Sequence, residues 1–526
     1  MNYKNGLLLS NLFVLLLFFL FFLDASTPAT PSPAKLKALY NSLDPSSISQ
    51  HLAFYELYPE SPDGQKALKD SWKLLSGSHE ISKNRLPPLY AYQDAVQGVI
   101  ALVNKPATQK LIHLNGSEIE LIEKISYHLP NRRLKGHYVL QEEEVLTLPA
   151  EEIDLARGLL LSQIPPSHER LMQLQSYEAM LDLMALQILI RIPSTALPET
   201  KIRAINSFIF DEMGYRFPPH SLYAKDLDLY TFLPSVLDSR KGVCLGVSIL
   251  YISLAQRLGL PLEVITPPGH IYVRYRNGDK IVNIETTARG VHIDSDQYLS
   301  VDTRALVERN IKEVIGLAHF NQASVYWHQG EYEKALASYQ KALPYLPHDM
   351  LLKELMAYNY LFTGHKETAM SLLKEVENHL PDYSVCKQTV AEDYLLGLVD
   401  AEGIKPLFLQ VDEHRDSILK KKDALLNVIE KYPHFRAGIF AAASAWLQLH
   451  RMSEALHLLE KYHALYPNDA SAEYYLAQIY AERLDYPKAW LHLQLAEQIA
   501  ESRKHYPKAL KDLRKSLATH FPASNP

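Results

Sequence analysis

Apolar residues recur at helical spacing through the first part of the chain. The spacing is clear at Gln65–Leu75 and Ala91–Val103, and it is interrupted at Pro62-Asp63-Gly64 and Pro87-Pro88. We therefore predict a helical region over residues 36–148. It contains no motif to which a chemical mechanism can be attached.

From Pro149 onward the pattern changes from helices to short strands. The strands Ile271–Tyr275 and Lys280–Thr286 flank Asn277-Gly278, a strong sequence signal for a tight hairpin. Helices followed by a small antiparallel sheet predict an α+β unit over residues 149–305. The predicted helices of this unit are Glu151–Leu161, Tyr177–Ile192, Lys201–Met213 and Val243–Leu258.

The C-terminal part of the chain repeats with a period of 34 residues. Small and aromatic residues recur in register, and the resulting pattern resembles the tetratricopeptide repeat, in which helix pairs stack to bury their apolar faces. We predict such repeats over 315–383 and 436–520, separated by a degenerate, insertion-bearing stretch over 384–435. The small residues are explained by close helix packing. The recurring positions include Ala323, Tyr326, Ala357, Tyr360, Ala443, Trp446, Ala477 and Tyr480.

Composition excludes several classes of protein. The 526 residues include 54 basic and 60 acidic side chains, a net charge of −6, with 47% hydrophobic residues. This balance argues against a disordered chain, a polytopic membrane protein and a basic nucleic-acid binder. Two cysteines are too few for a disulfide scaffold, no paired histidine spacing marks a metal site, and no glycine-rich phosphate loop is present. We therefore predict no metal and no cofactor.

The N-terminus carries a targeting pattern. Lys4 precedes an apolar run over Leu7–Leu23, and Ala25–Ala34 is rich in Ser, Thr, Pro and Ala. This pattern predicts a cleaved signal peptide or an uncleaved signal anchor over 1–25 and a linker over 26–35. Either case places the rest of the chain across the cytoplasmic membrane, as a periplasmic, secreted or anchored protein. The alternative is a buried helix of a cytosolic protein.

Cys244 is a candidate nucleophile because of its place at the start of a predicted helix. The positive end of a helix dipole favours the thiolate, which is the reactive form of the side chain. Position alone also fits a small buried residue. Cys386 lies between repeats and is interpreted as a packed thiol, with a Cys244–Cys386 disulfide as the alternative.

The predicted hairpin places a histidine beside an acid. In a loop centred on Asn277-Gly278, His270 and Glu285 are directly opposite, with Cβ atoms about 5 Å apart. A carboxylate there would orient the imidazole and stabilise its protonated form. Such a pair also occurs on protein surfaces. With Cys244 upstream, the set follows the order nucleophile, base and orienting acid.

Four segments resemble the core of the transglutaminase-like superfamily, and its SirB-type N-terminal domain in particular. They are Arg240–Ser248, Leu254–Pro261, Pro268–Arg274 and Asn283–Thr287. The resemblance covers about 150–300. It implies a cysteine-protease-like fold, and a tetratricopeptide tail is common in that branch. The predicted fold is therefore this α+β core between an N-terminal helical region and an all-α repeat solenoid.

The resemblance also implies a Cys-His-Asp triad, which Cys244, His270 and Glu285 match except that the acid is Glu. Many SirB-type members have replaced the cysteine, whereas this chain keeps it. Two functions follow as expectations. One is amide or peptide acyl transfer, by hydrolysis or transamidation. The other is a catalytically silent scaffold. In both, the repeats bind a protein or peptide, with no nucleic acid and with membrane contact only through an uncleaved N-terminal segment.

Overall fold

The structure is a computed structural model that describes residues 31–76, 95–218 apart from 108 and 112, 231–412 and 414–520. The chain divides into two compact units, residues 1–91 and 92–526. Among the described residues no helix is both long and apolar enough to cross a membrane. The apolar run Leu7–Leu23 lies outside the described residues.

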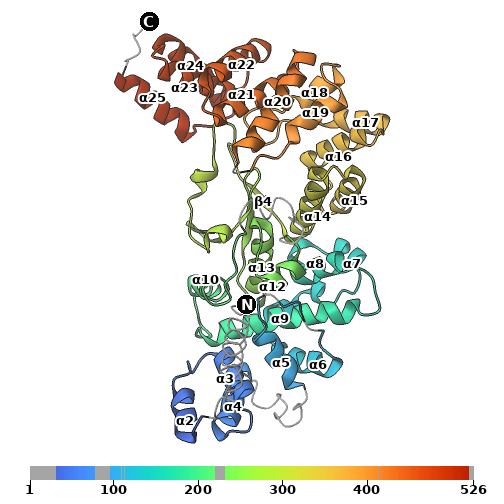
Figure 1. Cartoon of the computed structure of the whole chain (residues 1–526), viewed down its shortest axis with the longest axis vertical. Helices are drawn as coiled ribbons and strands as arrows, with labels where there is room; N and C mark the ends of the chain where they lie inside the picture. Colours follow the sequence, from blue (N-terminus) through green and yellow to red (C-terminus); the bar gives the residue numbers. More distant parts are fainter. Residues whose placement is uncertain are drawn as a thin grey trace, which may run out of the picture. The chain divides into compact units, whose positions relative to one another are not determined.

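The described part of the first unit contains three helices, drawn in blue in Figure 1: α2 (Pro33–Asn41), α3 (Ile48–Leu57) and α4 (Pro62–Ser76). Leu36, Phe54 and Ala67 form its small buried core. The prediction of a helix over Gln65–Leu75 is confirmed within α4. Pro62 begins that helix, because proline suits the first helical position, where its missing N–H costs no hydrogen bond.

The second unit begins with helices that pack around α9 (Arg170–Ile190), which is buried along most of its length. The helix predicted from Glu151 starts later, at Leu155, because the Asp154 side chain accepts hydrogen bonds from the backbone N–H groups of Ala156 and Arg157. Glu151 instead lies in a short 3₁₀ turn. The other helices here are α5 (Val96–Val103), α6 (Gly116–Ser126), α7 (Glu142–Thr147), α8 (Leu155–Gln163), α10 (Pro198–Asn206) and α12 (Leu233–Ser239).

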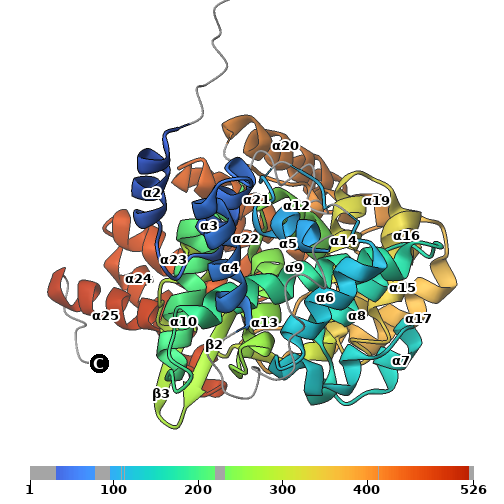
Figure 2. The same cartoon turned by 90° about the horizontal axis from the view of Figure 1, so that it is seen from below.

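A four-stranded antiparallel sheet follows helix α13 (Cys244–Arg257), which packs against strand β2 (Figure 2). The strand order is β3-β2-β1-β4. The sequence predicted the central hairpin but neither β1 nor β4, which contain four and three residues. The strands are β1 (Glu263–Thr266), β2 (Tyr272–Asn277), β3 (Lys280–Ile284) and β4 (Val307–Arg309).

The hairpin register differs from the predicted one. Asn277 pairs with Lys280 and Val273 with Ile284, so Gly278 and Asp279 form the turn. Gly278 has φ +57°, and a positive φ at the first central position is typical of a type II′ turn. The prediction that His270 pairs directly with Glu285 is therefore wrong. The shift is two residues, however, and an even shift keeps both side chains on the same face of the sheet.

The C-terminal helices form pairs that pack on their neighbours in sequence, coloured from yellow to red in Figure 1. Small residues at the repeat positions, such as Ala335, Ala357, Ala443 and Ala477, are completely buried between helices. The prediction of an α+β core joined to a helical repeat array is confirmed. The helices are α14 (Ile311–His328), α15 (Tyr332–Ala342), α16 (Met350–Phe362), α17 (Lys366–Val376), α18 (Val390–Leu395), α19 (Ala401–Ile404), α20 (Arg415–Lys431), α21 (Arg436–Gln448), α22 (Met452–Leu465), α23 (Ala470–Glu482), α24 (Tyr486–Ser502) and α25 (Lys508–His520).

Candidate active site

Cys244 is the first residue of α13, after Val243 as the N-cap, and its side chain is partly exposed. The N–H groups of a helix's first turn have no partners within the helix and give this end a positive potential. Gly242 allows the chain to enter the helix closely, because a Cβ atom there would lie 2.8 Å from the Val247 Cγ2 atom. The thiol therefore lies where a negative charge is stabilised.

His270 lies just before β2 and Glu285 just after β3, beyond the paired residues of the hairpin. The His270 Nε2 and Glu285 Oε2 atoms are 2.7 Å apart. His270 is positioned by a tight turn in which its N–H donates to the Pro267 carbonyl and Gly269 has φ +72°. The predicted contact therefore forms between two loop residues rather than across the ladder.

Cys244 and His270 line the same cavity, so the thiol lies beside this imidazole. Burial disfavours the charged imidazole, but the hydrogen bonds to Cys244 and Glu285 outweigh this effect and raise the pKa of His270 to about 10. The structure thus brings together all three residues that the sequence singled out.

Glu285 is held by more partners than the sequence indicated. Its Oε1 atom accepts hydrogen bonds from the backbone N–H and the hydroxyl of Thr287, at 3.0 and 2.6 Å. Its Oε2 atom also accepts the Tyr298 hydroxyl at 2.5 Å. Burial opposes the charged carboxylate, but the hydrogen bonds from His270, Thr287 and Tyr298 lower the pKa of Glu285 to about 2. The carboxylate is therefore ionised throughout the neutral range.

Tyr298 is the residue of this site that sequence reasoning missed. It lies in a 3₁₀ turn over Ser295–Tyr298, and its ring stacks on His270 with centroids 5.8 Å apart. The tyrosine comes from a loop without periodicity, so no pattern in the sequence marks it. Thr287 falls inside the segment that carries the family resemblance, but its role depends on the path of the chain after β3.

A cavity of about 200 Å³ opens beside Cys244 and His270. The core contributes the Pro267–Gly269 turn, and the first repeats contribute Phe320, Leu351 and Tyr383. Two further hollows, of about 600 and 490 Å³, share Leu351 and Tyr383 with it. Cys244 and His270 therefore lie beside a mainly apolar cavity, with the two further hollows next to it along the repeats.

Cys386 is buried and packs within the repeats. Its Sγ atom accepts a hydrogen bond from the Ala470 N–H at 3.4 Å, and burial raises the pKa of the thiol to about 12. Cys244 and Cys386 are both free thiols. The interpretation of Cys386 as a packed thiol fits these contacts, and the alternative disulfide is not formed in this structure.

Comparison with known proteins agrees with this architecture. Residues 175–316 match the model of the transglutaminase-like superfamily, and residues 316–349 match the tetratricopeptide repeat. A UPF0162 protein of Xylella fastidiosa strain Temecula1 is 24% identical over 188 residues, covering 33% of this chain and 66% of the relative. Another from strain 9a5c is 25% identical over 183 residues, covering 32% and 64%. The chain thus spans slightly less than two thirds of the length of these curated relatives.

Two more distant similarities cover smaller parts. The F-box only protein 21 of Mus musculus is 30% identical over 99 residues, which cover 19% of this chain and 14% of that protein. Among solved structures, a thermophilic tetratricopeptide protein of Thermus thermophilus is 18% identical, with a TM-score of 0.19, and the match covers 39% of this chain and 97% of that one.

The chain therefore carries a transglutaminase-like core followed by tetratricopeptide repeats. Repeats of this kind present extended surfaces to other polypeptides.

Proposed function

We propose that this protein is a cysteine-dependent acyl-transfer enzyme that acts on amide bonds of a protein or peptide. The observation that carries the proposal is the grouping of three side chains at one cavity: Cys244 and His270 both line it, and the His270 imidazole contacts the Glu285 carboxylate. A packed structural cysteine does not need this arrangement. The contrast with Cys386 is direct, because that thiol is buried and the charged side chains that act on it are the carboxylates of Asp469 and Asp302.

The proposed reaction has two steps. The Cys244 sulfur attacks the carbonyl carbon, and the first-turn N–H groups of α13 stabilise the developing oxyanion. When the C–N bond breaks, the amine leaves with the proton that His270 carries, and a thioester remains on Cys244. His270 then takes a proton from water or from a second amine, which attacks the thioester and releases Cys244. Glu285 holds the imidazole in place and stabilises its charged form.

A reactive acyl donor tests this chemistry without knowledge of the natural substrate. p-Nitrophenyl acetate should acetylate Cys244 of the full-length protein, with release of one equivalent of p-nitrophenol per active chain. Mass spectrometry of the tryptic peptides identifies the acetylated residue. Cys244→Ala should abolish the burst, whereas Cys386→Ser should leave it unchanged. Acetylation that is absent from Cys244, or equally fast in His270→Gln, would refute the proposed mechanism.

The rival function is a silent scaffold in which the repeats alone act. The observation that favours it is the pair of hollows along the repeats, which extend well beyond the reactive residues. A scaffold would bind its polypeptide partner equally well with Cys244→Ala and would give no thioester. The acetylation experiment therefore separates the two functions. Binding of a polypeptide by the repeats is common to both.

We also propose that residues 1–25 direct the chain across the cytoplasmic membrane, on the strength of Lys4 and the apolar run Leu7–Leu23. Alkaline phosphatase fused after residue 35 should be active in bacterial cells, since the enzyme matures only outside the cytoplasm. Replacing Leu15 and Leu16 with Arg should abolish this activity. An inactive fusion with the natural segment would contradict export.

A further inference from the structure

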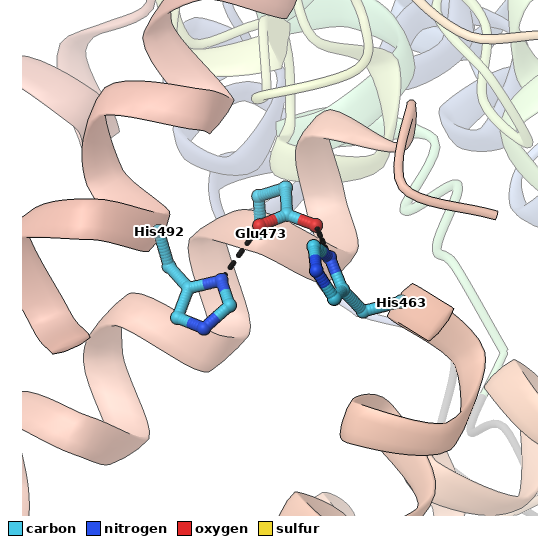
Figure 3. Close-up of side chains that lie close together, drawn as sticks. All are labelled: His463, Glu473 and His492. Atoms are coloured by element: carbon cyan, nitrogen blue, oxygen red, sulfur yellow. Dashed lines mark hydrogen bonds and ion pairs between the residues drawn. The ribbon is translucent and has the colours of Figure 1, made fainter. Parts of the chain in front are cut away.

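A second group of ionisable side chains lies in the last repeats. His463 on α22, Glu473 on α23 and His492 on α24 point toward one another from three different helices (Figure 3). The His463 Nδ1 atom lies 2.5 Å from Glu473 Oε1, and the His492 Nδ1 atom lies 2.7 Å from Glu473 Oε2. Two imidazoles therefore face the two oxygens of one carboxylate.

Burial makes the negative charge of the Glu473 carboxylate energetically costly. Glu473 is completely buried, and the side chains of His492 and His463 are 10% and 32% exposed. Within the part of the chain that the structure describes, the ion pairs of Glu473 are to these two imidazoles, with no lysine or arginine among them. A buried carboxylate is stable only when a positive charge or full hydrogen bonding compensates it. A divalent cation would supply that positive charge.

The donor atoms match a particular class of cation. Two imidazole nitrogens and a carboxylate are ligands that zinc binds at about 2.0–2.2 Å, with water completing the coordination. The three ligand atoms lie within 4.8 Å of one another. The Tyr480 ring stacks on His492 with centroids 5.4 Å apart and so fixes the direction of that imidazole. Binding would require that both nitrogens lose their protons and separate slightly from the carboxylate.

We propose that His463, Glu473 and His492 form a binding site for a divalent transition-metal ion, with zinc as the ion that suits the donor set. The ion would join α22, α23 and α24, and hence two successive repeats, through one centre. The partly exposed side of His463 leaves a coordination position for water. The sequence-based prediction of no metal relied on ligand spacing within one helix, whereas these ligands come from three.

The other buried cluster with metal-binding residue types differs in its charge. His137, Asp154 and Glu178 also lie close together, but Glu178 accepts two hydrogen bonds from Arg157, at 2.7 and 2.6 Å. Asp154 accepts a further bond from Asn131 at 3.0 Å. The Arg157 guanidinium already compensates Glu178, so a cation at this cluster would be repelled. We therefore assign a structural role to that cluster.

Titration of the full-length, metal-free protein with Zn²⁺ in a calorimeter tests the proposal, with the visible absorption of bound Co²⁺ as a second readout. We expect one ion per chain from this site. Glu473→Gln and His492→Asn should each weaken binding by about 100-fold or more, because even loss of an outer-shell partner costs 10–100-fold. Glutamine keeps the shape of Glu473 and can still form hydrogen bonds with both imidazoles.

Two controls make the result specific. His457→Asn alters an exposed histidine of α22, the helix that carries His463, and should leave binding unchanged. Cys244→Ala should also leave it unchanged, which separates this site from metal capture by the candidate active site. Absence of binding to protein with native circular dichroism would overturn the proposal. So would binding that survives Glu473→Gln or that is lost with Cys244→Ala.

Discussion

His270→Gln is expected to slow the alkylation of Cys244 by iodoacetamide at pH 7 by roughly 30-fold, because a free thiol with a pKa of ~8.5 is only about 3% thiolate at that pH. In the intact site the imidazole lies beside the sulfur, and the pKa of His270 is raised to about 10. The positive charge of the imidazole favours the thiolate at neutral pH. Glutamine can donate a hydrogen bond but carries no charge, so the thiolate would lose its electrostatic partner.

The charges of His270 and Glu285 also set the sign of the pH dependence. The pKa of His270 is raised and that of Glu285 is lowered to about 2, so both charges persist between these values and are lost outside them. The imidazolium charge is therefore present from pH 6 to pH 9, and under the proposed mechanism the rate of Cys244 alkylation should depend less on pH than that of an ordinary thiol. The rate for an ordinary thiol falls about tenfold for each pH unit below its pKa of ~8.5. In His270→Gln the profile should become that of an ordinary thiol.

Labelling must report one thiol, so the measurement uses Cys386→Ser, which removes the buried cysteine of the repeats. Tyr298→Phe provides a graded variant, because it deletes one of the hydrogen bonds to Glu285 and keeps the ring that stacks on His270. We expect an intermediate rate for it. A wild-type profile that already rises tenfold per unit from pH 6 to pH 8 would show that no activated pair exists, and the scaffold function would be favoured.

The sequence located the candidate site because two features of it are local. A cysteine in the first turn of α13 follows from the helix pattern, and the hairpin signal brings the flanking residues His270 and Glu285 to the same end of the hairpin. The exact register depended on which two residues form the turn, and the sequence signal at Asn277-Gly278 placed it one residue too early. The His270–Glu285 contact still forms, because the observed pairing differs from the predicted one by two residues, an even number.

Other parts of the site could not be predicted from sequence patterns, because they depend on contacts between segments that are distant in the sequence. Tyr298 reaches Glu285 from a loop, and the cavity wall contributed by Phe320 and Tyr383 depends on how the repeats pack on the core. Likewise, Glu473 contacts His463 and His492, which lie on two neighbouring helices. Hydrophobic periodicity indicates which face of a single helix or strand is buried. It does not indicate which other segments of the chain that face contacts.

The repeats themselves were predictable because their period is long and regular. Small residues recur where helices approach closely, and the structure buries them completely at Ala357 and Ala443. Between residues 384 and 435 the pattern fails, and the structure has two short helices there, α18 and α19, followed by the longer α20. Without a strict repeat, the lengths of these helices are set by local contacts.

Asp182→Asn is expected to destabilise the core strongly. Asp182 is completely buried and accepts a hydrogen bond from the Nε atom of Arg257 at 2.7 Å, with further bonds from Arg132 and Ser126. Arg257 is also completely buried. Removing one partner of a buried ion pair leaves an uncompensated charge, which typically costs about 3–5 kcal/mol.

The loss should affect the helix that carries the nucleophile, because α13 runs from Cys244 to Arg257 and Asp182 anchors its last residue to α9. Native-state hydrogen exchange is the appropriate measurement, since a chain of several parts does not unfold in one step. The opening free energy of α13 amides should fall by about 3–5 kcal/mol. Arg257→Met combined with Asp182→Asn should recover part of this loss, because the uncompensated positive charge of Arg257 is removed with its side chain.

The matched control is Glu120→Gln, which breaks the exposed ion pair with Lys124 on α6 and should leave the exchange of α13 unchanged. If Asp182→Asn left that exchange equally unaffected, the buried pair would not be what fixes α13, and the placement of Cys244 would depend on apolar packing alone.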